Sequence, residues 1–139
     1  MSRIYFTDRD LGRKFPGILA AAGLQVERHE SLFPPDGSDE QWLEYCGVNG
    51  RIAITHNRRI RYTPNELAAV TRHRVALLVV IGHGPITELA LNFVNSIERI
   101  ESFVESHEPP YIAKVYRAAP ADRTKNAAAK GGVSLWYPK

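Results

Sequence analysis

The stretch VALLVVI, residues 75–81, is apolar at every position. A strand buried on both faces shows this pattern, because helices cover both sides of a parallel sheet. Residues 63–74, just before it, are typical of a helix. Thr63 occupies the N-cap position, Pro64 the first helical position, and Glu66 completes a capping box. A helix that leads into a central strand predicts an α/β fold.

Strand and helix patterns alternate along the rest of the chain. Short β-rich segments predict further strands at 3–7, 24–29, 51–55 and 111–117. The strand at 111–117 is expected at an edge of the sheet. Apolar residues at helical spacing predict helices at 10–23, 38–50 and 85–107. The last of these ranges is expected to be a single long helix. Strands separated by helices favour a central, mostly parallel sheet with helices on both faces.

Length and composition fit one globular domain. The chain has 139 residues, enough for a single hydrophobic core. No apolar run approaches the roughly 20 residues of a membrane-spanning helix and no signal peptide is recognisable, so a cytoplasmic location is expected. Cys46 is the single cysteine, which excludes an internal disulfide. Its helical context favours a small buried side chain without a catalytic role.

The net charge of +3 is unevenly distributed. Residues 114–139 carry six lysines and arginines against one acid, a charge of +5, which leaves −2 on residues 1–113. Such a basic tail indicates an anionic partner or, more simply, a solvated terminus. Residues 118–132 are rich in Ala, Gly and Lys and are expected to be mobile when free. The final VSLWYPK (133–139) is apolar enough to dock on its own domain or on another chain.

Acidic side chains follow two of the expected strands. Asp8 and Asp10 come after the first, and Asp39 and Glu40 open the helix after the second. Ligands of open parallel sheets bind outside the carboxyl ends of the strands, so these carboxylates are expected to converge. Converging carboxylates favour a hard cation such as Mg²⁺ or Mn²⁺. A simpler interpretation stays open, since Asp10 could cap a helix at Leu11 and the acids at 39 and 40 suit any helix dipole.

Histidines and glycines give weaker signals. The histidines lack the close spacing of a zinc motif; they are His29, His56, His73, His83 and His107. The sequence GHG at 82–84 could present backbone N–H groups to a phosphate, but a turn into a helix at Pro85 explains it as well.

Two segments together resemble a known family. IYFTDRDLGRKFPGILAAAGLQVERHE (4–30) and SDEQWLEYCGVNGRIAITHN (38–57) are similar to the PIN-like ribonucleases, specifically to the VapC-type toxin branch. The resemblance rests on an aspartate that ends the first strand, an Asp-Glu pair that opens a helix, and a strand that ends in Thr-x-Asp. It extends from residue 3 to about residue 117, which divides the chain into a PIN-like domain (1–117) and a basic C-terminal tail (118–139).

The resemblance implies a three-layer α/β/α domain whose acidic side chains hold Mg²⁺ or Mn²⁺ and hydrolyse RNA. Asp8 matches the first acidic ligand and Asp39 the second, with Glu40 as the alternative for that place. Asn57 stands where the family has a third aspartate, so the implied catalytic and metal-binding set is Asp8, Asp39 and Asn57. An amide brings no charge, which weakens cation binding and phosphoryl-transfer electrostatics. Either the chain is a natural variant with weak or lost activity, or an aspartate was replaced so that a toxic nuclease could be produced.

Three arginines follow the strand at 51–55. Arg58, Arg59 and Arg61 would lie beside the acidic centre and contact RNA phosphates, which positions a strand without reading its sequence. The alternative is that they face water or pair with nearby acids. The family resemblance also implies a cognate antitoxin protein that masks the cleft, and a toxin homodimer.

Two other functions are compatible with parts of the sequence. A PIN-like domain in which asparagine is native at position 57 could be an inactive module that binds RNA or a protein partner. The opening IYFTDRD also resembles a phosphorelay receiver domain, which keeps acids after its first strand. A receiver needs a phospho-accepting aspartate at the end of the third strand, where this chain has Thr55-His56-Asn57.

Overall fold

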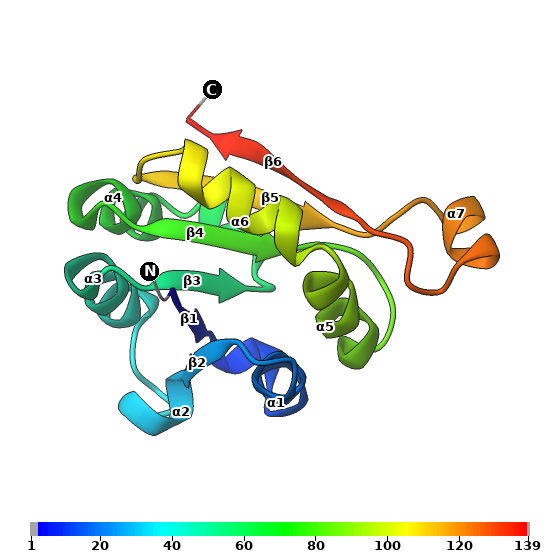
Figure 1. Cartoon of the computed structure of the whole chain (residues 1–139). Coiled ribbons are helices and arrows are strands. Elements are labelled where there is room, and N and C mark those ends of the chain that lie inside the picture. The colour runs from blue at the N-terminus through cyan, green and yellow to red at the C-terminus, as the bar shows by residue number, and fades with distance from the viewer. Residues whose placement is uncertain (1–2, 139) are drawn as a thin grey trace.

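A single six-stranded sheet forms the centre of the molecule in a computed structural model, which describes residues 3–138 (Figure 1). Its order is β2-β1-β3-β4-β5-β6. The first five strands are parallel and β6 is antiparallel to β5. The strands are β1 (Ile4–Thr7), β2 (Gln25–Arg28), β3 (Ile52–Thr55), β4 (Ala76–Val80), β5 (Tyr111–Tyr116) and β6 (Gly132–Tyr137). All five residues of β4 are buried, which confirms the central strand predicted at 75–81.

Helices cover both faces of this sheet. The α-helices are α1 (Lys14–Ala21), α2 (His29–Leu32), α3 (Asp39–Asn49), α4 (Pro64–His73), α5 (Ile86–Asn95), α6 (Ile97–Ser106) and α7 (Pro120–Lys125). Two 3-10 helices, η1 (Arg9–Leu11) and η2 (Arg58–Arg61), follow β1 and β3. Apolar residues of α1, α5 and α6 pack on one face, and those of α3 and α4 pack on the other. The fold is therefore the predicted three-layer α/β/α sandwich.

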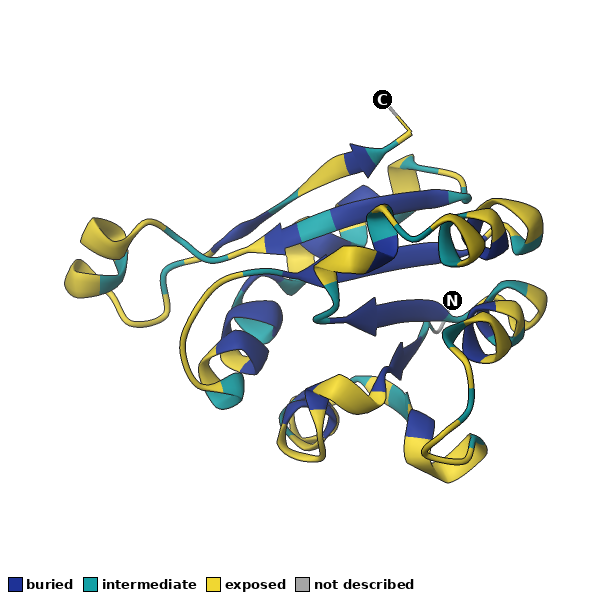
Figure 2. Cartoon of the chain, turned by 180° about the vertical axis from the view of Figure 1, so that it is seen from behind, coloured by how far each residue is buried: buried dark blue, intermediate teal, exposed yellow. Residues whose placement is uncertain are grey.

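Side-chain alternation along the strands builds two cores. In β3, Ile54 belongs to the core beneath α1 and α5, whereas Ala53 belongs to the core beneath α3 and α4. Successive strand residues point to opposite faces, so each strand contributes to both layers. Figure 2 shows the result, with buried strands between helices whose outer sides are exposed. Cys46 is fully buried beneath α3, as expected for a small core side chain, and burial raises the pKa of its thiol.

The prediction of a single helix at 85–107 is wrong. Two helices occupy this range, and Ser96 separates them with helix-incompatible backbone angles (φ −100°, ψ 9°). Ser96 is fully buried, and its Oγ accepts a hydrogen bond of 2.9 Å from the backbone N–H of Gly131. The break lets α5 pack against α1 while α6 contacts β6 (Figure 1). A continuous apolar stripe could not reveal it, because the partner residue is distant in the chain.

The C-terminal tail is built into the sheet. The prediction that 111–117 forms an edge strand is wrong, because β6 pairs with β5 on the side away from β4. Within the segment that is expected to be mobile when free, residues 120–125 form the short α7 on a projecting loop (Figure 1). Of the two docking alternatives for the final apolar residues, the chain uses its own domain.

None of the helices within residues 3–138 combines the length and apolar character needed to cross a bilayer.

Candidate active site

The strand order reverses direction between β1 and β3. The chain leaves β1 toward β2 on one side, and β3 leads to β4 and β5 on the other. Ligands of open parallel sheets bind at such a switch point, outside the carboxyl ends of the strands. Asp8 directly follows β1, and Thr55 ends the neighbouring β3. The switch point therefore coincides with the acidic residues that follow these strands.

Asp8 is held rigidly at this point. Only 5% of the residue is exposed. Its Oδ1 accepts a hydrogen bond of 2.7 Å from the backbone N–H of Arg9, and its Oδ2 accepts one of 2.8 Å from the Thr55 hydroxyl. A buried carboxylate with two donors has a fixed orientation, so β1 and β3 together determine where its oxygens point.

Asp10 lies against the same threonine. Its carboxylate is 3.3 Å from the Thr55 hydroxyl and accepts the backbone N–H of His56 at 3.2 Å. The 3-10 helix here has Asp8 as its N-cap, so the expectation that Asp10 caps a helix at Leu11 is wrong. Thr55 has one hydroxyl proton, which it can donate to only one of the two carboxylates at a time. The shorter contact favours Asp8 and leaves Asp10 with the weaker support.

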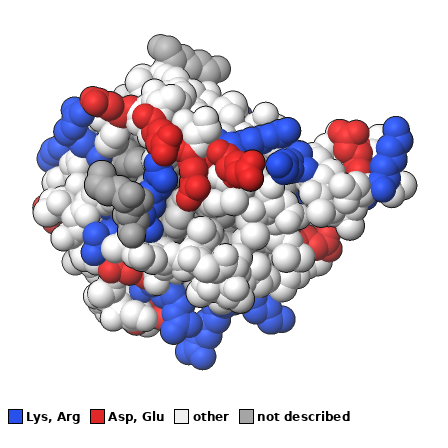
Figure 3. Space-filling view, in the orientation of Figure 1, with Lys and Arg blue, Asp and Glu red and all other residues white. Residues whose placement is uncertain are grey.

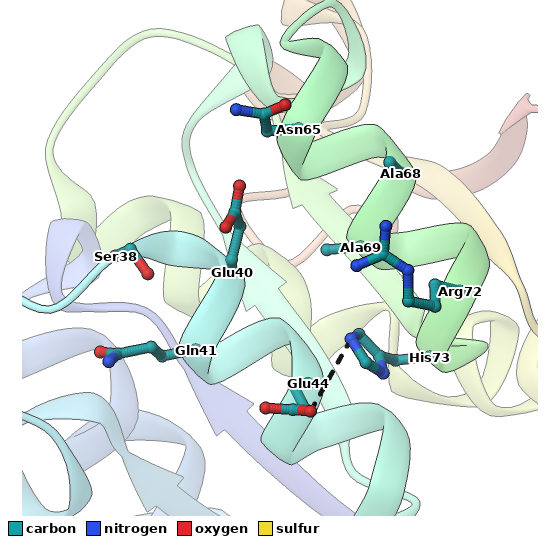
Figure 4. A pocket seen from close by; sticks show the side chains of 9 residues that line it. All are labelled: Ser38, Glu40, Gln41, Glu44, Asn65, Ala68, Ala69, Arg72 and His73. Atoms are coloured by element: carbon teal, nitrogen blue, oxygen red, sulfur yellow. Dashed lines mark ion pairs between the residues drawn. The ribbon is translucent and has the colours of Figure 1, made fainter.

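Asp39 and Glu40 diverge at the start of α3. Asp39 is half-buried, and its Oδ1 accepts a hydrogen bond of 3.0 Å from the indole N–H of Trp42. Glu40 is exposed and lines a groove of about 660 Å³ between α3 and α4. Figure 4 shows its side chain extending toward Asn65 across this groove, in which Glu44 pairs with His73. Of the two acids, Asp39 is the one whose charge acts on Asp8.

Glu66 also lies in this region; its sequence position makes it a candidate for a fourth family acid, although a capping box is the simpler interpretation. Thr63 is the N-cap of α4, but its hydroxyl donates to the carbonyl of Arg59 and makes no cap hydrogen bond. The predicted capping box is therefore absent. Glu66 instead lies beside Asp39, and its Oε1 is buried without a hydrogen-bond partner among residues 3–138. Because the spacing of Thr63 and Glu66 also fits a capping box, the sequence alone favours that interpretation over a place beside Asp39.

Burial and mutual repulsion raise the pKa of these carboxyls. The pKa of Asp8 is raised to about 7, first by burial and then by the charges of Asp10 and Asp39, against hydrogen bonds from Thr55 and Arg9. Burial also raises the pKa of Asp10. The pKa of Glu66 is raised to about 7 by burial and by the neighbouring Asp39, with a smaller effect of Glu40. Near neutral pH the negative charges of these carboxyls repel one another, and a bound proton or cation would relieve this repulsion.

Asn57 adjoins the cluster through its backbone. Its N–H donates to the Thr55 hydroxyl oxygen at 3.1 Å, and its side-chain Oδ1 accepts the backbone N–H of Arg59 at 3.1 Å. The side chain therefore caps η2. A carbonyl oxygen has two lone pairs, so this amide keeps an acceptor site for another group.

The three arginines after β3 have different surroundings. Arg58 and Arg59 are exposed, and Arg58 lines a pocket beyond His56. Arg61 instead lies over two aromatic rings, 5.4 Å from the ring centre of Tyr62 and 4.7 Å from that of Tyr137. Its stacked guanidinium helps join η2 to β6.

Away from this site, acidic side chains lie along α6 on the face shown in Figure 3.

The acidic cluster consists of four carboxyls from three segments: Asp8 and Asp10 at η1, Asp39 at the start of α3, and Glu66 in α4. Within residues 3–138, no group of three or more Asp, Glu, His or Cys side chains already has a metal-binding arrangement. The donor chemistry nevertheless suits a hard cation, because buried carboxylates raise one another's pKa and one oxygen of Glu66 has no partner.

Comparison with protein families shows which family the chain resembles. A family model described as a PIN like domain matches residues 4–81. The matched segment runs from β1 through β4 and contains all four residues of the acidic cluster. Neither the curated proteins nor the solved structures contain a match to the chain.

Proposed function

Because this chain belongs to the PIN-like domain family, a nuclease-type superfamily, we propose that it is a metal-dependent endoribonuclease that hydrolyses RNA phosphodiesters. We further propose that it is the toxin of a toxin–antitoxin pair, and that Asn57 lowers its activity. The observation that carries the enzymatic proposal is the acidic cluster at the switch point between β1 and β3. The same geometry gives no support to a receiver domain, since β3 is followed by Asn57 rather than by a phospho-accepting aspartate.

Asp8 and Asp39 would hold a Mg²⁺ or Mn²⁺ ion, with Asp10 and Glu66 as the nearest further carboxylates. When bound, such an ion supplies Lewis acidity and lowers the pKa of a coordinated water. The chain's own contacts prepare these ligands. Thr55 orients the Asp8 oxygens and the indole of Trp42 orients Asp39, so neither carboxylate can rotate freely.

Glu66 is suited to proton transfer in this proposal. A general base works best when its pKa is close to the pH at which it acts. The pKa of Glu66 is raised to about 7, and its Oε1 has no hydrogen-bond partner within the described residues. Its Oε1 could therefore accept a proton from an attacking water.

Position 57 would then set the level of activity. An aspartate there would add a negative charge next to Thr55, whose hydroxyl contacts both Asp8 and Asp10. The present asparagine keeps the backbone geometry and the cap on η2 but removes that charge. We therefore expect weak cation binding and slow cleavage by this chain, and stronger binding and faster cleavage by Asn57→Asp.

The test compares this chain with Asn57→Asp on single-stranded RNA in the presence of Mn²⁺ or Mg²⁺. Cleavage by Asn57→Asp that is lost in Asn57→Asp/Asp8→Ala would support the proposal. The matched control is Asn57→Asp/Asp36→Ala, because Asp36 is exposed in the loop before α3 and lies outside the cluster. Expressing Asn57→Asp without its neighbouring genes should arrest growth if the chain is a toxin.

A second candidate function is an inactive PIN-like module that binds RNA or a protein partner. Asn57 favours it, because its side chain already serves as the cap of η2 and so has a structural use of its own. In that case neither this chain nor Asn57→Asp would cleave RNA. The cognate antitoxin and the homodimer belong to the toxin proposal, and co-purification of a neighbouring gene product would test them.

A further inference from the structure

A second hollow lies next to the acidic cluster, at the carboxyl ends of β3, β4 and β5. Its volume is about 480 Å³. Five of its lining side chains are basic or can become so, and none of its described lining residues is acidic. We call it the basic pocket, and these five residues are His56, Arg58, His83, Arg117 and Arg123.

Arg117 is built into the wall of the basic pocket. One terminal nitrogen donates to the carbonyl of His83 at 3.0 Å, and the other pairs with Glu88 at 2.9 Å. Gly82 and Gly84 have φ values of +125° and +118°, which side chains rarely tolerate. A Cβ at Gly84 would also lie 3.0 Å from the guanidinium of Arg117. The GHG turn thus leaves room for this arginine, a use that neither sequence interpretation of the turn had included.

Arg58 and Arg123 carry the charge that remains available to a ligand. Arg117 is largely neutralised by its ion pair with Glu88. Arg58 is exposed and takes part in no ion pair within residues 3–138. Arg123 donates its Nε to the carbonyl of Ala118 at 3.1 Å, which holds the side chain in place and leaves its two terminal nitrogens. Two guanidinium groups on one pocket suit a phosphate, whose oxygens match their planar donor pairs.

His56 connects the basic pocket to the acidic cluster. Its backbone N–H holds Asp10, and its ring lines the pocket with Nδ1 donating to the carbonyl of Val80 at 2.8 Å. The two sites are therefore separated by a single residue. A phosphodiester chain that places one phosphate at the acidic cluster would have another phosphate within reach of the pocket.

We infer that the basic pocket binds a phosphate group of the RNA strand, next to the phosphodiester at the acidic cluster. The choice of RNA rests on the proposed function, whereas the choice of phosphate rests on the pocket itself. The phosphate could be an internal phosphodiester or a 5′-terminal monoester, since both present the same anionic oxygens. The pocket would position the strand without reading its bases.

The test measures the affinity of a fluorescent single-stranded RNA for the full chain by anisotropy, in EDTA so that no cleavage occurs. Two pairs of variants separate the contribution of the basic pocket to RNA affinity from the effect of overall charge. Arg58→Gln is compared with Arg72→Gln, because both arginines are exposed and only Arg58 lines the pocket, whereas Arg72 lies on α4. Arg123→Gln is compared with Lys125→Gln, which removes the same charge from the same short helix.

We expect Arg58→Gln and Arg123→Gln each to weaken binding about fivefold or more, and their controls to stay within about twofold. Each pocket variant should also reduce the salt dependence of binding by about one phosphate contact. Equal losses within each pair would overturn the inference, as would undetectable RNA binding by the parent chain. Melting temperatures of the four variants verify that each is folded.

A second arm identifies the kind of phosphate. Tighter binding of 5′-phosphorylated than of 5′-hydroxyl RNA, lost in Arg123→Gln, would place a terminal phosphate in the pocket. Equal binding of both RNAs, with the same loss in the pocket variants, would place an internal one there. Cleavage by Asn57→Asp is measured separately. Pocket-dependent binding without cleavage would end the enzymatic proposal alone, and cleavage without pocket-dependent binding would end this inference alone.

Discussion

Replacing Asp8 with asparagine should make the metal-free protein more stable at pH 8. The pKa of Asp8 is raised from 3.8 to about 7. A carboxyl whose pKa is higher in the folded state than in the unfolded state destabilises the fold progressively as the pH rises from the unfolded-state pKa to the folded-state pKa. Above the folded-state pKa the full free-energy cost is present. A change from 3.8 to about 7 corresponds to about 4 kcal/mol at pH 8.

The substitution removes this cost but also removes one acceptor. Asparagine has a single acceptor oxygen, so it can satisfy either the Thr55 hydroxyl or the backbone N–H of Arg9, whereas Asp8 satisfies both. Losing one such hydrogen bond costs about 1–3 kcal/mol. The net gain for Asp8→Asn is therefore about 2 kcal/mol at pH 8, or roughly 4–8 °C in melting temperature.

Thermal unfolding in EDTA measures this gain across pH. At pH 5 the parent carboxyl is already protonated, so the advantage of Asp8→Asn should vanish or reverse. Adding Mn²⁺ at pH 8 should stabilise the parent and leave Asp8→Asn unchanged, because the cation would replace the missing positive charge. Asp36→Asn, in an exposed loop, is the control and should track the parent at every pH. A variant that is less stable than the parent at pH 8 by the same amount as at pH 5 would refute the reasoning.

Three further changes probe the support of Asp8 and the packing of the fold. Thr55→Val should lower stability by about 1–3 kcal/mol and weaken Mn²⁺ binding, because it removes the hydroxyl that orients Asp8; calorimetric unfolding and cation titration would measure both. Gly47→Ala should lower the unfolding free energy by at least about 2 kcal/mol in urea, because its Cβ would stand 2.1 Å from the carbonyl oxygen of His73 and force α3 away from α4. Ser96→Ala should cost about 1–3 kcal/mol and speed amide exchange just before β6, where its hydroxyl is the acceptor; unchanged exchange there would count against the anchoring role.

The arrangement of Asp8 and Asp39 at one end of the sheet was predictable because it follows from general geometry. Parallel strands place all their carboxyl ends at the same edge, whatever the side chains are. An aspartate after β1 and another at the start of the helix that precedes β3 must therefore approach each other. The pattern of VALLVVI identified the central strand for a similarly general reason, since a fully apolar strand must be covered on both faces.

The break at Ser96 could not be predicted from the sequence, and for Glu66 the role of a fourth acid could not be preferred over a helix cap, because both roles depend on distant partners. The spacing of Thr63 and Glu66 matches a local cap, and only the packing of α4 beside α3 turns that glutamate toward Asp39. At Ser96 the periodicity of apolar residues continues across the break, while the bond that anchors the break comes from Gly131. Pairing of β6 with β5 is equally non-local, so the tail could be recognised as apolar without its position being known.

Direct measurement of Mn²⁺ binding tests most decisively whether carboxylates on separate segments form one cation site. Loss of the free Mn²⁺ electron paramagnetic resonance signal would be followed for the parent chain, Asn57→Asp and Asn57→Asp/Asp8→Ala. We expect one saturable site that is weak in the parent, about tenfold or more tighter in Asn57→Asp, and lost when Asp8 is removed. Binding that is equal in all three proteins, or absent from all of them, would contradict this expectation.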